Sequence, residues 1–131
     1  DYNNTAYLDC YVNIVVEHMC EATFITEKTA KCLLAEQFFV IFGGVGIIQI
    51  LEELGFDTYN DIIDHKFYDT ESNLAVRLEK IHSVLKELQH KDWHQIYKDT
   101  EQRRQKNRDL LLSKKVTFDF QSRLQQLIDK Y

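Results

Sequence analysis

The feature that most constrains the fold is the alternation of short apolar runs with segments of helical periodicity. Residues 11–17 are apolar on both faces and rich in β-branched side chains, and residues 38–42 are continuously apolar. Both patterns are typical of strands that helices cover on both sides. Between them, residues 27–36 show the three- and four-residue spacing of one helical face. Two strands joined through a helix predict a small parallel sheet of the α/β class, half of a Rossmann-type unit. Residues 56–59 are a candidate third strand, which completes a βαβαβ order.

A glycine-rich turn follows the second apolar run. Gly43, Gly44 and Gly46 form this turn. The apolar residues of 47–54 then predict a second helix, and Gly55 is placed to end it. Glycines before a helix let the backbone approach a phosphate closely, and they equally allow a tight turn with positive φ. Both interpretations stay open, although the third glycine of the dinucleotide-binding fingerprint is missing.

The second half of the chain is predicted to be helical. An apolar stripe with alternating steps of four and three residues predicts a helix over 74–88. The members of this stripe are Leu74, Leu78, Ile81, Leu85 and Leu88. Further helices are predicted over 93–112 and over 119–131, because apolar side chains recur there with helical spacing.

The chain has the length of one domain. We predict a single domain over residues 1–131, in which about 11–69 form the α/β part and about 73–131 form the helical part. The centre of the helix predicted over 93–112 is basic, and we interpret it as a solvated face. Its positive residues are Arg103, Arg104, Lys106 and Arg108.

Composition narrows the classes of function. A formal net charge of −5 argues against a general nucleic-acid binder. No apolar run approaches the ~18 residues of a membrane-spanning helix, so no membrane span is predicted. Cys10, Cys20 and Cys32 are odd in number and lack C-x-x-C spacing, which indicates reduced, mostly buried thiols in a cytoplasmic protein. The chain starts at Asp1 instead of Met, so a segment upstream of it can be missing.

Histidine and carboxylate positions do not predict a metal site or an acid–base pair. His90 and His94 are four residues apart and could share a metal ion, but no third ligand is evident. His65 lies near Asp64 and Asp69 in an acidic, turn-like segment, and we interpret this group as an ordinary loop. We therefore name no catalytic residue, no metal ligand and no cofactor.

The start of the first predicted helix is a candidate binding site. Thr26 is suited to cap the helix, and Glu27 lies in the first turn, where the helix dipole favours an anion. The helix dipole disfavours Lys28 in the same turn by roughly 0.3–1 kcal/mol. An anion bound there would make the position favourable for a lysine. Glu17 ends the first predicted strand, at the edge where ligands bind in open α/β sheets. The alternatives, a capped surface helix with solvated charges and a glutamate that simply leaves the sheet, stay open.

The same stretch carries a resemblance to a known family. Residues 24–28, Phe-Ile-Thr-Glu-Lys, followed by Lys31, resemble the TEK segment of fucosyltransferase-like glycosyltransferases of the two-domain, twin-Rossmann (GT-B) type. The likeness continues at 38–43, 51–56, 58–59 and 63–64, and it covers about residues 11–69. In this family the segment belongs to the C-terminal, donor-binding domain. The resemblance implies that Glu27 binds the ribose of a nucleotide sugar and that Lys28 meets its pyrophosphate.

The resemblance implies a nucleotide-sugar (nucleoside diphosphate) binding module, either a fragment of a glycosyltransferase or a standalone relative. Its expected donor-binding residues are Glu17, Thr26, Glu27, Lys28, Gly43, Gly44 and Gly46. The N-terminal acceptor domain, which would supply the catalytic base, has no counterpart in the chain, so sugar transfer by this chain alone is not expected. The alternative is a non-catalytic interaction module with a degenerate donor site. In both cases we expect association with a second copy or with the missing domain, because a small sheet leaves edges that proteins usually cover.

Overall fold

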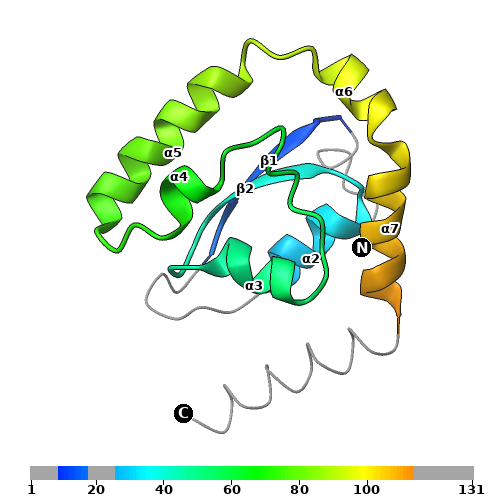
Figure 1. The fold of residues 1–131 in the computed structure, drawn as a ribbon, viewed down its shortest axis with the longest axis horizontal. Coiled ribbons are helices and arrows are strands. Elements are labelled where there is room, and N and C mark those ends of the chain that lie inside the picture. The colour runs from blue at the N-terminus through cyan, green and yellow to red at the C-terminus, as the bar shows by residue number, and fades with distance from the viewer. Residues whose placement is uncertain (1–8, 18–25, 114–131) are drawn as a thin grey trace, which may run out of the picture.

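The computed structural model describes residues 9–17 and 26–113, which form an α/β fold around a two-stranded parallel sheet (Figure 1). β1 (Val12–Val16) and β2 (Phe38–Phe42) are joined through α2 (Glu27–Leu34). The two strands pair in register from their first to their last residues, so they end at the same edge of the sheet. The predicted α/β class, its small parallel half-Rossmann sheet and the helical character of the chain that follows are confirmed.

The described chain after β2 is mostly helical. Its helices are α3 (Ile47–Glu53), α4 (Lys66–Asp69), α5 (Leu74–Leu88), α6 (Trp93–Asp99) and α7 (Glu101–Leu112). The helix predicted over 93–112 is interrupted at Thr100, whose hydroxyl donates to the carbonyl oxygens of Ile96 and Tyr97. Such bonds from a threonine to the preceding turn bend a helix, which accounts for the break. The helix predicted over 119–131 lies outside the described residues.

The candidate third strand at 56–59 does not form. The N–H of Phe56 closes the end of α3, the N–H of Asp57 donates to the Asn107 side chain, and the N–H of Tyr59 donates to the Asp57 carboxylate. These donors are therefore not available to a sheet. Tyr59 also has a φ of 59°, which an extended strand does not allow. Phe56 and Tyr59 are apolar because they pack into the core, not because they belong to a strand.

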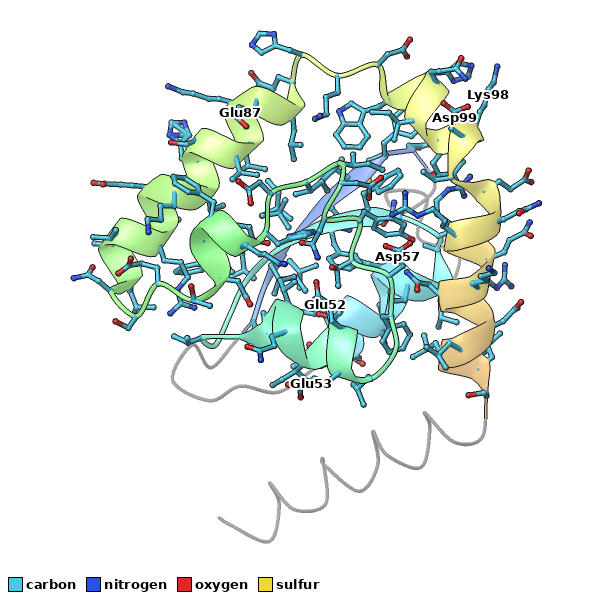
Figure 2. All side chains as sticks on the ribbon, in the orientation of Figure 1. Glu52, Glu53, Asp57, Glu87, Lys98 and Asp99 are labelled. Atoms are coloured by element: carbon cyan, nitrogen blue, oxygen red, sulfur yellow. The ribbon has the colours of Figure 1, made fainter. Side chains whose placement is uncertain are left out.

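β2 lies at the centre of the core, and β1 is a partly exposed edge. Side chains fill the space between the sheet and the helices around it (Figure 2). α2 packs against both strands, whereas α5 packs against β2, so β2 is covered on both faces. On β1, Val15 is buried, but Ile14 and Val16 are 51% and 54% exposed. Because side chains alternate along a strand, the described helices leave the Ile14–Val16 face of β1 uncovered.

The apolar stripe predicted for α5 is only partly correct. Ile81 and Leu88 are buried, but Leu74 and Leu78 are exposed. The buried face of this helix consists of Arg77, Ile81, Val84 and Leu88. The stripe is shifted because its first member is a charged residue, which apolar periodicity does not detect.

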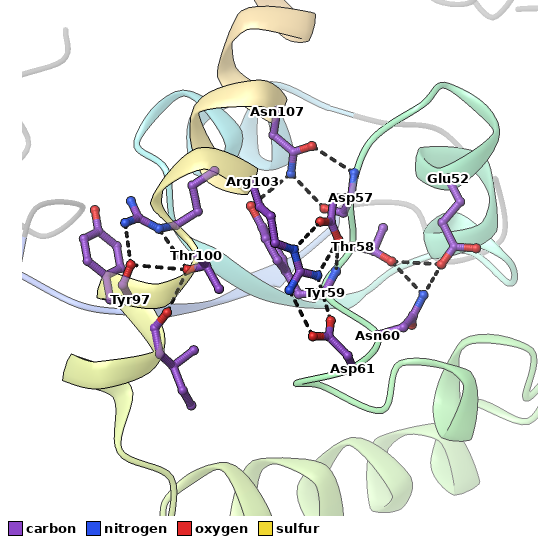
Figure 3. A network of polar contacts seen from close by, with 12 residues as sticks. Glu52, Asp57, Thr58, Tyr59, Asn60, Asp61, Tyr97, Thr100, Arg103 and Asn107 are labelled. Carbon is purple, nitrogen blue, oxygen red and sulfur yellow. Dashed lines mark hydrogen bonds and ion pairs between the residues drawn. The ribbon is translucent and has the colours of Figure 1, made fainter.

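The basic centre of α7 is only in part the solvated face that was predicted: Lys106 and Arg108 are exposed, but Arg103 is half-buried and Arg104 is buried. Arg103 donates from Nε to Asp57, at 2.6 Å, and from Nη2 to Asp61, at 2.7 Å (Figure 3). Arg104 is buried, lies over the ring of Tyr97 and donates to its carbonyl oxygen. The two arginines therefore attach α7 to the 57–61 segment and to α6. The charges of these two arginines were expected to face solvent, but they hold α7 against the neighbouring elements.

His65 belongs to the core and not to an ordinary loop. Its ring is fully buried, with Nδ1 2.6 Å from the Tyr68 hydroxyl and Nε2 2.8 Å from the carbonyl oxygen of Thr58. Burial lowers the pKa of His65 from 6.5 to about 4, so the ring is neutral at physiological pH. The residue therefore ties the start of α4 to the segment after α3.

Neither of the two described cysteines is in a disulfide, as predicted, but only one of them is buried. Cys32 lies in the core of the fold, and burial raises its pKa to about 12. Cys10 is exposed, because it lies in the segment that precedes β1. Cys20 lies outside the described residues.

Candidate functional site

The carboxyl ends of β1 and β2 meet at one edge of the sheet, and this edge holds most of the expected site residues. Glu17 follows β1, and its N–H donates to the carbonyl oxygen of Phe42 at 2.9 Å. Gly43 follows β2, and a Cβ atom on it would lie only 3.2 Å from Cγ of Glu17. A larger residue at position 43 would therefore push against Glu17. The structure brings Glu17 and Gly43 together at the edge where parallel sheets bind ligands.

Glu17 is buried and lies at the N-terminus of α2. Its carboxylate accepts hydrogen bonds from the hydroxyls of Thr26, at 2.6 Å, and Thr29, at 2.9 Å. The Thr26 hydroxyl also accepts from the N–H of Lys28, which confirms Thr26 as the N-cap. Thr29 was not predicted to belong to this cluster, although its three-residue spacing from Thr26 places both on one helical face. The cluster fixes the start of α2 to the end of β1.

Lys28 reaches back to the end of β1. Its Nζ donates to the carbonyl oxygen of Val16 at 2.8 Å. Successive residues of a strand point their backbone groups to opposite sides, and Glu17 uses its N–H toward β2. The Val16 carbonyl therefore faces the edge of β1 that no other described strand pairs with, the free edge, and the ammonium group of Lys28 lies at that edge.

Glu27 does not join this cluster. Its side chain is 81% exposed and lies 4.0 Å from Nζ of Lys31, one turn along α2. Of the three residues of the TEK segment, Thr26 and Lys28 are directed to the end of β1 and Glu27 is directed to solvent.

The turn after β2 is occupied by a carboxylate of the protein itself. The N–H groups of Ile48 and Gln49, in the first turn of α3, donate to the Asp69 carboxylate at 3.1 and 3.4 Å. Gly46 donates its N–H to the Asp69 carbonyl oxygen and has a φ of 78°. Asp69 is buried, and burial raises its pKa more than these backbone hydrogen bonds lower it. This geometry favours the tight-turn interpretation for Gly46, with Gly44 buried in the same turn.

Arg77 is a further charged group at this edge, and the sequence did not single it out. It lies in the first turn of α5 and is buried. Its Nη1 donates to the carbonyl oxygen of Gly43, and its guanidinium group lies 5.8 Å from the centre of the Phe42 ring. Its burial could have been inferred from the sequence, because helical spacing places Arg77 on the same face of α5 as Ile81 and Leu88.

Two hollows lined by described residues lie away from this edge. One, of about 480 Å³, includes Tyr11, Gln37 and His94 near the amino ends of the strands. The other, of about 440 Å³, lies on α5 and includes Leu78 and Leu85. Within residues 9–17 and 26–113, no group of three or more His, Cys, Asp or Glu side chains could hold a metal ion. His94 instead pairs with the Tyr11 hydroxyl through Nδ1.

The chain matches no family model, and no curated protein or solved structure matches it significantly. In the part of the chain that the structure describes, none of the helices is both long and apolar enough to cross a membrane. The geometry at the carboxyl ends of β1 and β2 is therefore the basis of the function proposed below.

Proposed function

We propose that the chain binds a nucleoside diphosphate, the common part of nucleotide sugars, at the carboxyl ends of β1 and β2. The observation that carries this proposal is the position of Lys28. Its ammonium group lies at the end of a parallel strand and at the start of α2, and its hydrogen-bond partner among the described residues is a neutral carbonyl oxygen. The positive charge is thus available to an anion, and the dipole of α2 favours an anion at the same place.

Glu27 is suited to the ribose of the same ligand. A carboxylate only accepts hydrogen bonds, and ribose hydroxyls donate them. The 4.0 Å pair between Glu27 and Lys31 is exposed, and such pairs contribute little, so it can open at small cost. Because Glu27 and Lys28 are adjacent, one nucleotide can contact both with its ribose and its diphosphate.

Glu17, Gly43, Gly44 and Gly46 have structural roles in this proposal. The buried Glu17 carboxylate already accepts from two threonine hydroxyls, and it would repel a phosphate placed directly against it. Asp69 already uses the N–H groups at the start of α3. We therefore place the diphosphate on the solvent side of Glu17, beside Lys28, with Gly43 allowing the two strand ends to meet.

The chemistry that this arrangement supports is binding of a glycosyl donor. In glycosyl transfer, a donor site orients the nucleotide and stabilises the departing diphosphate, and the positive charge of Lys28 would do the latter. We assign no catalytic base to the described residues. The proposed activity of this chain by itself is binding without sugar transfer.

Titration calorimetry with nucleoside diphosphates tests this function. Replacing Lys28 with alanine removes one charge-assisted hydrogen bond, worth about 1.5–3 kcal/mol, so the affinity should fall roughly tenfold to a hundredfold. Glu27→Gln should reduce the affinity less, because an amide oxygen still accepts.

Lys31→Ala is the matched control for Lys28→Ala. Lys31 has the same charge and lies in the same helix, but its ammonium group pairs with Glu27 and not with the strand end. Its replacement should leave the affinity within about twofold, since a solvent-screened charge at this distance contributes little. If Lys28→Ala and Lys31→Ala lose the same affinity for the nucleotide, the proposed site is refuted. No binding by the wild type at millimolar nucleotide would also refute it.

A second candidate function is protein interaction through the free edge of β1. Ile14 and Val16 are half exposed on the uncovered face of β1 beside this edge, and lysine at an edge strand is a common device against unwanted strand pairing. In this interpretation Lys28 protects the edge, and Lys28→Ala should promote self-association without altering any nucleotide affinity. Light scattering on the same variant separates the two functions.

A further inference from the structure

α5 lies along β2 and runs in the opposite direction. In its first turn, Arg77 lies over the ring of Phe42, at the carboxyl end of β2. Trp93 donates to the carbonyl oxygen of the last residue of α5, and its ring lies 5.3 Å from that of Phe38, at the amino end of β2. A five-residue strand spans about 13 Å, which is the rise of about nine helical residues. Residues 81–82 of α5 therefore lie level with the middle of β2.

One side of α5 faces α4, and the opposite side faces β1. The N–H of Ile41 lies on the side of β2 away from β1 and donates to the hydroxyl of Tyr68 in α4. α4 therefore lies at the edge of β2 that is opposite to β1. Lys80 of α5 lies over an aromatic ring of α4. Leu78 and Leu85 lie on the opposite side of the helix from Lys80, because successive residues are about 100° apart. These two leucines are thus directed toward β1.

The leucine side of α5 and the uncovered face of β1 lie beside each other. Val16 pairs with Phe42, whose ring contacts α5, so the half-exposed side chains of Ile14 and Val16 are on the same face of the sheet as α5. Leu78 is exposed, and together with Leu85 it lines the hollow of about 440 Å³ on α5. Partly exposed apolar side chains therefore border the free edge of β1, and edges of this kind are usually covered by another element.

We propose that a second copy of the chain covers this surface, with the two β1 strands paired antiparallel about a twofold axis beside Ile14. The N–H of Glu17 is directed to β2, so Val12, Ile14 and Val16 direct their backbone groups to the free edge. Pairing centred on Ile14 joins Ile14 to its own equivalent, and Val12 to Val16 of the second copy. Lys28 does not prevent this pairing, because the Val16 carbonyl oxygen that it contacts can accept a second hydrogen bond.

The same axis also suits α5. Ile14 pairs with Val40, the middle residue of β2, and residues 81–82 of α5 lie at that level. An axis there brings Leu78 of one copy level with Leu85 of the other, because each lies three or four residues from the centre. One twofold axis therefore satisfies the strand edge and the helix together, as a self-complementary interface requires.

Charges on α5 are complementary under this axis. Glu79 and Lys86 are exposed and lie seven residues apart, as Leu78 and Leu85 do. The antiparallel arrangement sets Glu79 of one copy level with Lys86 of the other, at both ends of the helix pair. A parallel arrangement would set like charges level, which is unfavourable. The inference rests on the second candidate function, to which it gives a partner, and it does not depend on nucleotide binding.

Sedimentation equilibrium of the full chain with charged replacements of Ile14 tests the proposal, because the axis places this residue opposite itself. Ile14→Lys and Ile14→Glu each lose an apolar contact and set like charges opposite each other. Each alone should dimerise roughly tenfold or more weakly than the wild type. An equimolar mixture should dimerise about threefold or more tightly than either variant alone, since a lysine then faces a glutamate. The same two replacements at Leu112, which is exposed on α7, should leave dimerisation within about twofold.

Each other outcome overturns the proposal. A wild type that stays monomeric at millimolar concentration does so, whatever the nucleotide titrations show. Equal effects of the replacements at Ile14 and Leu112, or a mixture that dimerises no better than its components, would do so as well. Should the Ile14 variants fail to fold, Leu78→Lys against Leu112→Lys decides the question, and equal dimerisation of these two is the contradicting result. A monomeric wild type whose Lys28→Ala variant self-associates would overturn this dimer and leave the second candidate function in place.

Discussion

Replacing Phe38 with alanine is expected to lower the free energy of unfolding by about 3–5 kcal/mol, the usual cost of truncating a buried phenylalanine. Phe38 begins β2 and is fully buried. Its ring lies 4.7 Å from the ring of Tyr59 and 5.3 Å from that of Trp93, measured between centroids. It therefore joins the sheet to the 56–59 segment and to α6, and its removal leaves a cavity that these three elements share.

Urea denaturation measures this loss, and Phe67→Ala provides the control. Phe67 is the same residue type in α4 but is 47% exposed, so its truncation should cost less than about 1 kcal/mol. If the two variants lose similar amounts of stability, the aromatic group around Phe38 is not the centre of the core.

The stability of the fold is expected to fall between pH 6.5 and about pH 4 because of His65. The folded pKa of this residue is about 4 and the ordinary value is 6.5, so the unfolded chain takes up its proton first as the pH decreases. A depressed histidine pKa therefore means that stability is complete above pH 6.5 and decreases below it. A difference of 2.5 pKa units corresponds to about 3 kcal/mol at pH 4.

Comparison with His65→Gln isolates the contribution of His65 to the pH dependence of the stability. Glutamine does not titrate, and it can still accept from Tyr68 and donate to the Thr58 carbonyl. The variant should be less stable than the wild type at pH 7, but the difference should shrink as the pH falls to 4. Asp69, whose raised pKa acts in the opposite direction, is present in both proteins and cancels. Parallel stability curves for the two proteins would show that His65 is not buried as described.

The elements that could be predicted from the sequence are those that local patterns determine. The apolar runs of β1 and β2 are visible because both faces of a covered strand must be apolar. Thr26 was recognisable as a cap because its hydroxyl serves an N–H only two residues away. The run at 56–59 was misleading for the same reason: its buried residues are apolar, but its N–H groups are used by side chains from distant segments.

The contacts that complete the candidate site could not be predicted, because they join residues far apart in the chain. Asp69 reaches the first turn of α3 across 21 residues, and Arg77 reaches Gly43 across 34. Neither spacing is a recognised motif. Arg103 and Arg104 were misinterpreted because a basic run is usually solvated, and only the tertiary structure brings Asp57, Asp61 and Tyr97 to them.

Amide NMR of the ¹⁵N-labelled chain during titration with a nucleoside diphosphate tests the central claim most directly. The amide signals of residues 26–29 and of Gly43 should shift together and saturate, because the ligand is placed at the end of β1 and the start of α2. The signals of α6, at the other end of the strands, should stay in place. Shifts confined to the hollow around Tyr11 and His94, or no shifts at millimolar nucleotide, would contradict the claim.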